Sequence, residues 1–354
     1  MARQCIGLDI GSSSVKLVQV KLSRKGMSLQ NFGIEPLPTA AIIDGTIGDP
    51  NAVAEAIRNL AKRIHLRGKD VAFAVSGNSV IIRRLQIPAM EGAALAEQME
   101  WEVRQNVPFA RDEVIVDWEV LVERTPEGQM EVVLVAAKRE VVEQYMQVVR
   151  AAGFNPVVVD TDAFAMQNAI DSVDGLVSGE TVAVINVGAH FSTISIVRDG
   201  KPVFHRNLSS GGDTFTEAIR HRLAVSQDGA EAYKVGSAAG AGAGSAADVV
   251  PQEVHRVLAQ VSEQVSAEFQ RSIDFYVNDA VDANLARVYL TGGSALVPQL
   301  PKAIQDRSGV PVMIFDPFSK MSVDARRFDV EYLRANAPVA SVALGLALRA
   351  PGDK

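Results

Sequence analysis

Cysteine is almost absent from the 354-residue sequence, in which Cys5 stands alone. A single cysteine excludes a disulfide within the chain and suits a reducing compartment, so a cytoplasmic protein is expected. Basic residues are not in excess either, because the formal net charge is −7, and this argues against a surface that binds nucleic acid.

Long hydrophobic runs are also missing. The longest one near the C-terminus, PVASVALGLAL (338–348), is too short to span a bilayer and predicts a buried helix. No long apolar segment follows the basic residue at the N-terminus, so no signal peptide is expected. A role at a membrane would therefore have to come through a partner protein.

The chain is longer than one ordinary hydrophobic core requires, so two domains are expected. Strand-like runs alternate with amphipathic helical runs, which predicts an α/β fold. Residues 85–152 form a more β-rich block and predict a small inserted α+β subdomain. Residues 236–248, GSAAGAGAGSAAD, are of low complexity and predict a mobile loop.

A short run near the N-terminus, IGLDIGSSSVKLV (6–18), combines an apolar strand with polar residues. Asp9 interrupts the strand, which ends in a glycine and three serines before Lys16. One interpretation is a hairpin turn, with VKLVQV as the return strand. The other is a phosphate site, in which small residues admit an anion, Lys16 adds positive charge and Asp9 holds a divalent cation through water. The run alone leaves both interpretations open.

Two later strand ends share this design. AVINVGAHFSTISIV carries Asn186 and Gly188 between two strands, and VYLTGGSALVPQL carries Gly292 and Gly293 before a helix. A single glycine turn is more often structural, since glycine is the usual residue where the backbone needs positive φ or close packing. Three such turns together favour a phosphate site between two facing hairpins.

These motifs resemble those of the actin/Hsp70/sugar-kinase superfamily of nucleotide-binding proteins. LDIGSSSVKLV is similar to its first phosphate motif, VINVGAHFST to the second, and LSSGGDTFTEAI to the segment after it. AEAYKVG resembles the segment that borders the ribose and base, and LTGGSALVPQL resembles the adenosine motif. The resemblance implies an α/β, actin/Hsp70-like fold of two nucleotide-binding domains with an inserted α+β subdomain.

The resemblance also implies a ligand and its contacts. ATP or ADP with Mg2+ is the expected cofactor, Asp9 is the expected residue at the metal, and no catalytic residue is assigned. The expected nucleotide contacts are Gly11, Ser12, Ser13, Ser14, Lys16, Gly188, Ser192, Gly211, Gly212, Asp213, Glu231, Lys234, Gly292, Gly293 and Ser294. For Glu231 and Lys234, an ordinary helical i,i+3 ion pair is an equally good interpretation.

The insert and the C-terminal third resemble the PilM family of type IV pilus assembly proteins, in the branch that also contains FtsA. The segments that carry this resemblance are FQRSIDFY, VYLTGGSALVPQLPKAI, DPFSKMSVDARRF and APVASVALGLALR. It implies a cytoplasmic, ATP-binding adaptor, peripheral at the inner membrane, that docks the N-terminal peptide of the inner-membrane protein PilN. The expected groove lies between the first domain and the insert.

Further partners follow from the same resemblance. Other inner-membrane proteins of the pilus machinery and self-association are expected, whereas nucleic acid and a direct membrane span are not. Two alternatives stay open. A small-molecule kinase of this fold would need a base for its acceptor hydroxyl, and no dedicated candidate is evident. An FtsA-like filament-forming protein would carry a C-terminal amphipathic helix, which is not expected after ALGLALRAPGDK.

The expected domain boundaries follow the motifs. The first domain takes residues 1–84, 153–185 and 330–354, the insert takes 85–152, and the second domain takes 186–329.

The second hairpin departs from the superfamily pattern. Asn186 stands where an aspartate usually orders the metal and the attacking water, so slow hydrolysis is expected. His190 replaces a small residue and is open to interpretation as a turn residue. Asp160 and Asp162 are candidates for a hydrolytic acid, or for helix N-caps, and Asp213 is expected to cap the next helix.

Overall fold

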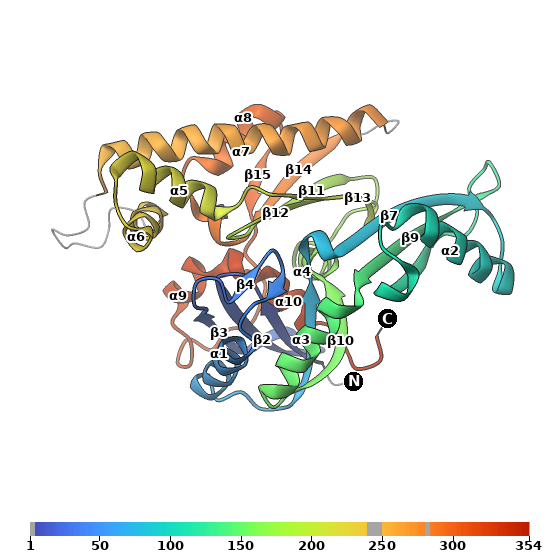
Figure 1. Cartoon of the computed structure of the whole chain (residues 1–354), viewed down its shortest axis with the longest axis horizontal. Helices are drawn as coiled ribbons and strands as arrows, with labels where there is room; N and C mark the ends of the chain where they lie inside the picture. Colours follow the sequence, from blue (N-terminus) through green and yellow to red (C-terminus); the bar gives the residue numbers. More distant parts are fainter. Residues whose placement is uncertain (1–3, 239–249, 280–283, 354) are drawn as a thin grey trace.

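The computed structural model describes residues 4–238, 250–279 and 284–353. Two five-stranded mixed sheets each form the centre of a domain, and a three-stranded sheet projects to one side as an insert (Figure 1). The α/β class and the inserted α+β unit predicted from the sequence are confirmed. The predicted loop 236–248 lies outside the described residues from 239 onward, and its first three residues end helix α6 (Gln227–Ala238).

The first domain is built on a sheet with the strand order β10-β6-β1-β2-β3. Strands β1, β2 and β3 are antiparallel neighbours, whereas β1, β6 and β10 run parallel. The strands are β1 (Ile6–Ile10), β2 (Ser14–Ser23), β3 (Gly26–Pro36), β6 (Asp70–Val75) and β10 (Asn155–Thr161). A small ribbon of β4 (Ile42–Ile43) and β5 (Thr46–Ile47) lies beside them.

Helices cover both faces of the first sheet. α1 (Pro50–Arg63) and α3 (Arg139–Ala151) contribute to the hydrophobic core on one face, and α4 (Asp162–Asp174) and α10 (Ser341–Ala347) to the core on the other. The side chain of Asp49 caps α1 by accepting hydrogen bonds from two backbone N–H groups. The C-terminal apolar run is α10, which is fully buried and confirms the predicted buried helix.

Two glycines allow α10 to approach its neighbours closely. A Cβ atom on Gly7 in β1 would overlap the carbonyl oxygen of Ala343, and one on Gly345 in α10 would overlap that of Ala165 in α4. Helix α10 therefore packs so closely against β1 and α4 that a side chain larger than glycine at position 7 or 345 would push the elements apart.

The second domain repeats this plan with the strand order β13-β12-β11-β14-β15. Its strands are β11 (Thr181–Val187), β12 (Ser192–Arg198), β13 (Lys201–Leu208), β14 (Leu285–Thr291) and β15 (Val312–Ile314). Helices α5 (Gly212–Leu223), α7 (Gln252–Asp279) and α8 (Leu300–Ser308) pack on one face. The apolar residues that recur every three or four positions along α7 all belong to this core.

The two domains share one hydrophobic cluster. Val182, Val184 and Tyr289, on the face of the second sheet that α7 does not cover, pack in the same cluster as Ala165 and Met166 of α4. Helix α4 thus touches both sheets and joins the domains through apolar packing.

The insert has a core of its own. Strands β7 (Val80–Pro88), β8 (Val114–Val122) and β9 (Gln129–Lys138) form an antiparallel sheet in the order β7-β9-β8, and α2 (Gly92–Asn106) packs on it. Leu95, Met99 and Val103 face this core from α2.

Two of the four boundaries expected from the sequence fall inside strands, and one helix packs with a different domain than expected. Strand β7 crosses residue 84, because Val80 and Ile82 pack in the first domain while Leu85 and Ile87 pack in the insert. Helix α3, expected in the insert, packs on the first sheet. Strand β11 crosses residue 185 and belongs wholly to the second sheet.

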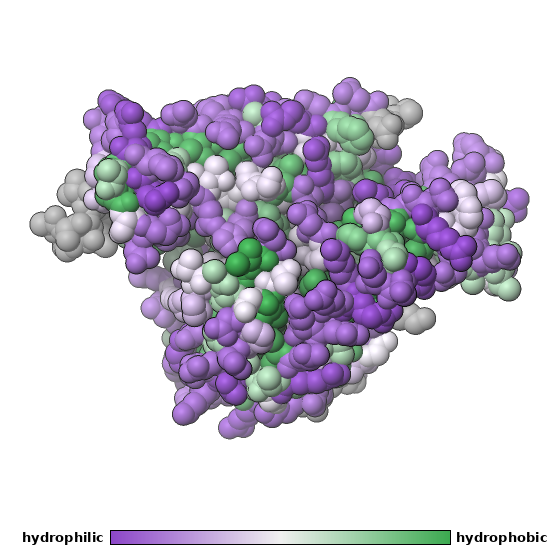
Figure 2. Space-filling view, in the orientation of Figure 1, coloured by the Kyte–Doolittle hydropathy of each residue, from purple (hydrophilic) through white to green (hydrophobic). Residues whose placement is uncertain are grey.

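The face drawn in Figure 2 is mainly hydrophilic, and its hydrophobic residues gather in small patches. Within the described ranges, no helix combines the length and the hydrophobicity needed to cross a bilayer.

Gly345→Ala should destabilise the protein by about 3 kcal/mol, because the new methyl group would force α10 away from α4. Gly236→Ala is a matched control, since Gly236 lies in α6 and a Cβ there would meet Val250 only at 3.6 Å. Helix propensity alone would make both changes stabilising by about 1 kcal/mol. Urea unfolding monitored by circular dichroism gives the sign, and a stabilised Gly345→Ala variant would contradict the packing argument.

Candidate functional site

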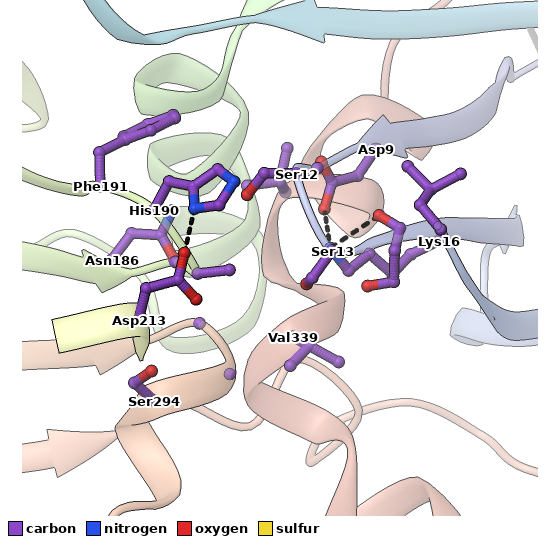
Figure 3. Close-up of a pocket in the computed structure, with 18 of the residues that line it drawn as sticks. Asp9, Ser12, Ser13, Lys16, Asn186, His190, Phe191, Asp213, Ser294 and Val339 are labelled. Atoms are coloured by element: carbon purple, nitrogen blue, oxygen red, sulfur yellow. Dashed lines mark hydrogen bonds and ion pairs between the residues drawn. The ribbon is translucent and has the colours of Figure 1, made fainter. Parts of the chain in front are cut away.

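A cavity of about 540 Å³ lies between the two domains. The loop between β1 and β2 borders it on one side and the loop between β11 and β12 on the other (Figure 3). The turn after β14 and the short helix η4 (Ala337–Ala340) contribute to the remaining wall. The three glycine turns singled out in the sequence therefore meet at one cavity.

The two hairpins have the same backbone geometry. In the first, the N–H of Gly11 donates to the carbonyl oxygen of Ser14, and in the second, the N–H of Gly188 donates to that of Phe191, each at 3.1 Å. In both hairpins four residues lie between the members of the last cross-strand pair, which is Ile10 with Val15 in the first and Val187 with Ser192 in the second. The prediction that both glycine turns lie between two strands is confirmed.

Lys16 and Asp9 face each other in the first hairpin. They are cross-strand neighbours, and the Lys16 Nζ atom lies 3.2 Å from Asp9 Oδ2 and 3.3 Å from the carbonyl oxygen of Ser14. Lys16 is only 9% exposed. A Cβ atom on Gly11 would come within 2.8 Å of Nζ, so a glycine at this position leaves room for the ammonium group. The run is thus a hairpin and also a lining of the cavity; the hairpin interpretation is confirmed, and the phosphate site stays a prediction.

Asn186 occupies in the second hairpin the position that Asp9 occupies in the first. Asn186 pairs with Thr193 as Asp9 pairs with Lys16. Gly292, at φ +89°, passes close to it, and a Cβ atom there would lie 2.5 Å from Asn186 Oδ1. The second hairpin therefore presents an amide where the first presents a carboxylate; the expectation of slow hydrolysis stays a prediction.

Asp213 does not cap helix α5, which corrects the sequence prediction. Gly211 is the N-cap residue, and Asp213 lies in the first turn, where its N–H donates to the carbonyl oxygen of Ala189 at 2.8 Å. The Asp213 carboxylate instead contacts Nδ1 of His190 in the second hairpin (Figure 3). The capping motif was ambiguous because the chain has two glycines in front of this aspartate.

Three of the expected contacts do not line the cavity. Ser192 is fully buried, and its hydroxyl donates to the carbonyl oxygen of Ser210 at 2.6 Å. Gly211 and Gly212 leave room for neighbours, since a Cβ atom would lie 2.5 Å from the Ala189 carbonyl oxygen and 2.6 Å from Ser294 Oγ, respectively. These three residues contact backbone and side-chain atoms next to the cavity lining and do not face the cavity themselves.

The other expected residues line the cavity together. They are Asp9, Gly11, Ser12, Ser13, Ser14, Lys16, Gly188, Asp213, Glu231, Lys234, Gly292, Gly293 and Ser294. Lys234 Nζ lies 2.7 Å from Glu231 Oε2 and also donates to Thr216 Oγ1 at 2.9 Å. The i,i+3 ion pair considered from the sequence therefore exists, and its two members line the cavity as well.

Sequence reasoning missed several apolar lining residues. Phe191, Pro338 and Val339 are among them, and the N–H of Gly292 donates to the carbonyl oxygen of Pro338 across the two domains. Phe191 lies within the second hairpin motif, whereas Pro338 and Val339 lie outside the phosphate motifs and reach the cavity only when the chain returns from the second domain to the first.

The comparisons with known proteins agree with this geometry. A family model described as type IV pilus assembly protein PilM matches residues 7–351. This chain belongs to the PilM family. The PilM–PilN type IV pilus biogenesis complex contains a chain 29% identical to it, with a TM-score of 0.85 and 98% of both chains covered.

Two other relatives show how far the PilM-family fold extends. Cell division protein FtsA of Streptococcus pneumoniae serotype 2 (strain D39) is 26% identical over 88% of this chain and 75% of its own length. MreB5 of Spiroplasma citri, solved bound to AMPPNP, is 14% identical, with a TM-score of 0.51 and coverage of 98% and 95%. The structural likenesses establish the actin-like fold expected from the motifs.

The two acids before and at the start of α4 have different surroundings in this PilM-family chain. Thr161 caps the helix, since its hydroxyl accepts from the N–H of Phe164 at 3.3 Å, so neither aspartate is the N-cap. Asp160 accepts from Arg349 Nε at 2.8 Å and does not line the cavity. Asp162 lines it, and burial, together with the charges of Asp9 and Asp160, raises its pKa to about 7.

Asp162→Asn should stabilise the protein more at pH 8 than at pH 5. The raised pKa of Asp162 means that the folded protein holds a proton that the unfolded chain releases near pH 4. Stability therefore falls as pH rises from about 4 to about 7, and the full penalty is present above that window. The substitution removes this titration.

Urea unfolding of both proteins at about pH 5 and about pH 8 measures the effect. Equal differences in free energy of unfolding at the two pH values would contradict the assignment. Asp160→Asn serves as a comparison, because it removes the charge that faces Arg349 in a buried pair and should destabilise at both pH values.

Proposed function

We propose that this protein is an actin-like adaptor of the type IV pilus machinery that binds ATP or ADP with Mg2+ and docks the N-terminal peptide of a PilN partner. Nucleotide binding is supported mainly by two hairpins of the same backbone geometry that lie on opposite sides of one cavity. Family membership and the likeness to the PilM–PilN complex support the pilus part.

The cavity suits a nucleotide in size and in lining. Its volume of about 540 Å³ is within the range of small-molecule sites. Small residues at positions 11–14 and 292–294 admit phosphate and ribose close to the backbone, and Lys16 supplies a charge-assisted contact. Pro338, Val339 and Val235 give an apolar wall for a base. MreB5, which shares the fold, was solved with AMPPNP, whose imido group stands in for the bridging oxygen of ATP.

Mg2+ would be coordinated at this site mainly by phosphate oxygens of the nucleotide and by water. Among the described residues, no three His, Cys, Asp or Glu side chains gather to hold a metal without other ligands. Mg2+ commonly keeps several waters and takes substrate phosphates as ligands, with one or two carboxylates nearby. Asp9, at the rim of the first hairpin, is the carboxylate that would hold such an ion through water.

Lys16→Ala should weaken MgADP binding by at least about tenfold, because it removes a buried charge-assisted contact of about 1.5–3 kcal/mol. Lys21→Ala, on the exposed part of the same strand, removes an equal charge away from the cavity and should leave affinity unchanged. Isothermal titration calorimetry compares the three proteins. Equal affinities would exclude Lys16 from the ligand site.

Two sheet edges make the junction of the first domain and the insert suitable for an extended peptide. Strand β10 is the edge of the first sheet, and β8 is an edge of the insert. Val157 and Val159 on β10 are 37% and 42% exposed, and Trp118 on β8 is 36% exposed. Burial lowers the pKa of Arg349, but its hydrogen bond and ion pair with Asp160 of β10, together with the charges of Asp353 and of Glu119 on β8, raise it overall. Glu119 is therefore close enough to Arg349 for the edges β10 and β8 to lie near one another.

An extended segment can add to such an edge through its backbone and place apolar side chains against the exposed valines. The partner in the solved complex is PilN, and we expect its N-terminal peptide here. Docking to an inner-membrane protein would place this chain at the cytoplasmic face of that membrane. Contacts with other pilus proteins and self-association stay predictions.

Val159→Lys should weaken binding of that peptide by at least about tenfold, because an ammonium group would have to lose water beneath the bound segment. Val177→Lys is the matched control, since Val177 is 56% exposed in the connection between α4 and β11. Fluorescence anisotropy of a labelled PilN N-terminal peptide gives the affinities. An unchanged affinity for Val159→Lys would place the docking surface elsewhere.

A further inference from the structure

The charge of the cavity is at odds with an anionic ligand. Two lysines face five acidic side chains, and no arginine is among the described residues that line it. The lysines are Lys16 and Lys234, and the acids are Asp9, Asp162, Asp213, Asp228 and Glu231. Both lysines already form ion pairs, with Asp9 and Glu231. A nucleotide stays anionic even with one Mg2+ bound, so further positive charge from a side chain at the phosphates would favour its binding.

His190 is the remaining titratable side chain that can supply it. It stands in the loop of the second hairpin, and its ring points from that hairpin toward Ser12 of the first (Figure 3). Its Nδ1 atom contacts the Asp213 carboxylate, which lies 23 residues further along the chain, in α5. His190 is partly exposed, so solvent protons reach it freely.

The Asp213 contact fixes the chemistry of the ring. A carboxylate accepts from Nδ1–H, so Nε2 of the neutral imidazole carries a lone pair and would repel a phosphate oxygen. A proton on Nε2 turns it into a donor, and Asp213 stabilises the resulting imidazolium through its opposite charge. The second hairpin would then present a cation to the phosphates, opposite Lys16 of the first.

We propose that His190, oriented by Asp213, is the proton-linked phosphate contact of the second hairpin, so that nucleotide binds together with a proton. This inference rests on the nucleotide function proposed above. Binding of the anion favours the protonated ring. Affinity should therefore be higher at about pH 6 than at about pH 8.

The other groups that face the cavity are common to all variants of the test. They are Asp9 and Lys16 of the first hairpin, Asp162 of α4, and Asp228, Glu231 and Lys234 of α6. The phosphates of the ligand also titrate in this range. The difference between the wild type and a variant at position 190 isolates the contribution of the ring.

Calorimetric titration of the full chain with MgADP at about pH 6 and about pH 8, in two buffers of different ionisation enthalpy, measures affinity and proton uptake. In the wild type, affinity should fall by about tenfold more than in His190→Gln over this range, and the variant should take up fewer protons on binding than the wild type, because Asp162 and the ligand phosphates titrate in both proteins. His221→Gln is the matched control, because His221 is exposed on α5 and pairs with Glu217 outside the cavity. It should behave as the wild type.

Two further arms separate a phosphate contact from a structural role. Adenosine, which has no phosphate, should bind the wild type and His190→Gln with the same pH dependence. Asp213→Asn keeps an acceptor for Nδ1–H but removes the charge that favours the imidazolium, so the ratio of the MgADP affinities at about pH 6 and about pH 8 should be smaller than in the wild type. A structural role for Asp213 alone would change affinity equally at all pH values.

The possible results separate a failure of the His190 proposal from a failure of the proposed nucleotide binding. Failure of the wild type to bind MgADP at any pH would overturn the nucleotide function and this inference with it. Binding with the same pH dependence and proton uptake in His190→Gln as in the wild type would overturn this inference alone.

Discussion

The apolar contact of α4 with both sheets is the constraint on which the site depends. Residues of α4 pack with the first sheet and with Val182, Val184 and Tyr289 of the second in one cluster. This contact lies behind the cavity and sets the separation of two hairpins that come from different domains. Each hairpin is specified locally by its glycine and its strand pairing, but the distance between them is a property of the shared core. A change in that core would alter the site without touching any residue that lines it.

Repetition of one plan explains how the site arises. In both domains a three-stranded antiparallel meander is extended by parallel strands, and the first hairpin of each meander reaches the cavity. The two hairpins differ at the same register position, where the first has Asp9 and the second has Asn186. The two sides of the cavity are therefore alike in backbone and different in charge. The asymmetry lies in side chains, with a lysine–aspartate pair on one side and a histidine–aspartate pair on the other.

The sequence predicted the features that short segments determine. The glycine–serine turn and the two hairpins follow from adjacent residues, and the structure confirms them. What it did not predict depends on distant contacts. The roles of Asp160 and Asp162 differ because Arg349 reaches only one of them, and the partner of His190 lies 23 residues away. Strand β7 crosses an expected boundary because one strand serves two cores, a pattern that period-two alternation does not reveal.

The wedging of α10 between β1 and α4 also constrains the order in which the chain can fold. Every strand of the second sheet precedes α10 in sequence, so that sheet can assemble on a nascent chain while the first still lacks one of its covering helices. Until residues 341–347 emerge from the ribosome, the apolar face of β1 and α4 stays open to solvent and to other chains. The domain that begins first is thus completed last, and its unfinished face is the surface that chaperones would have to protect during synthesis.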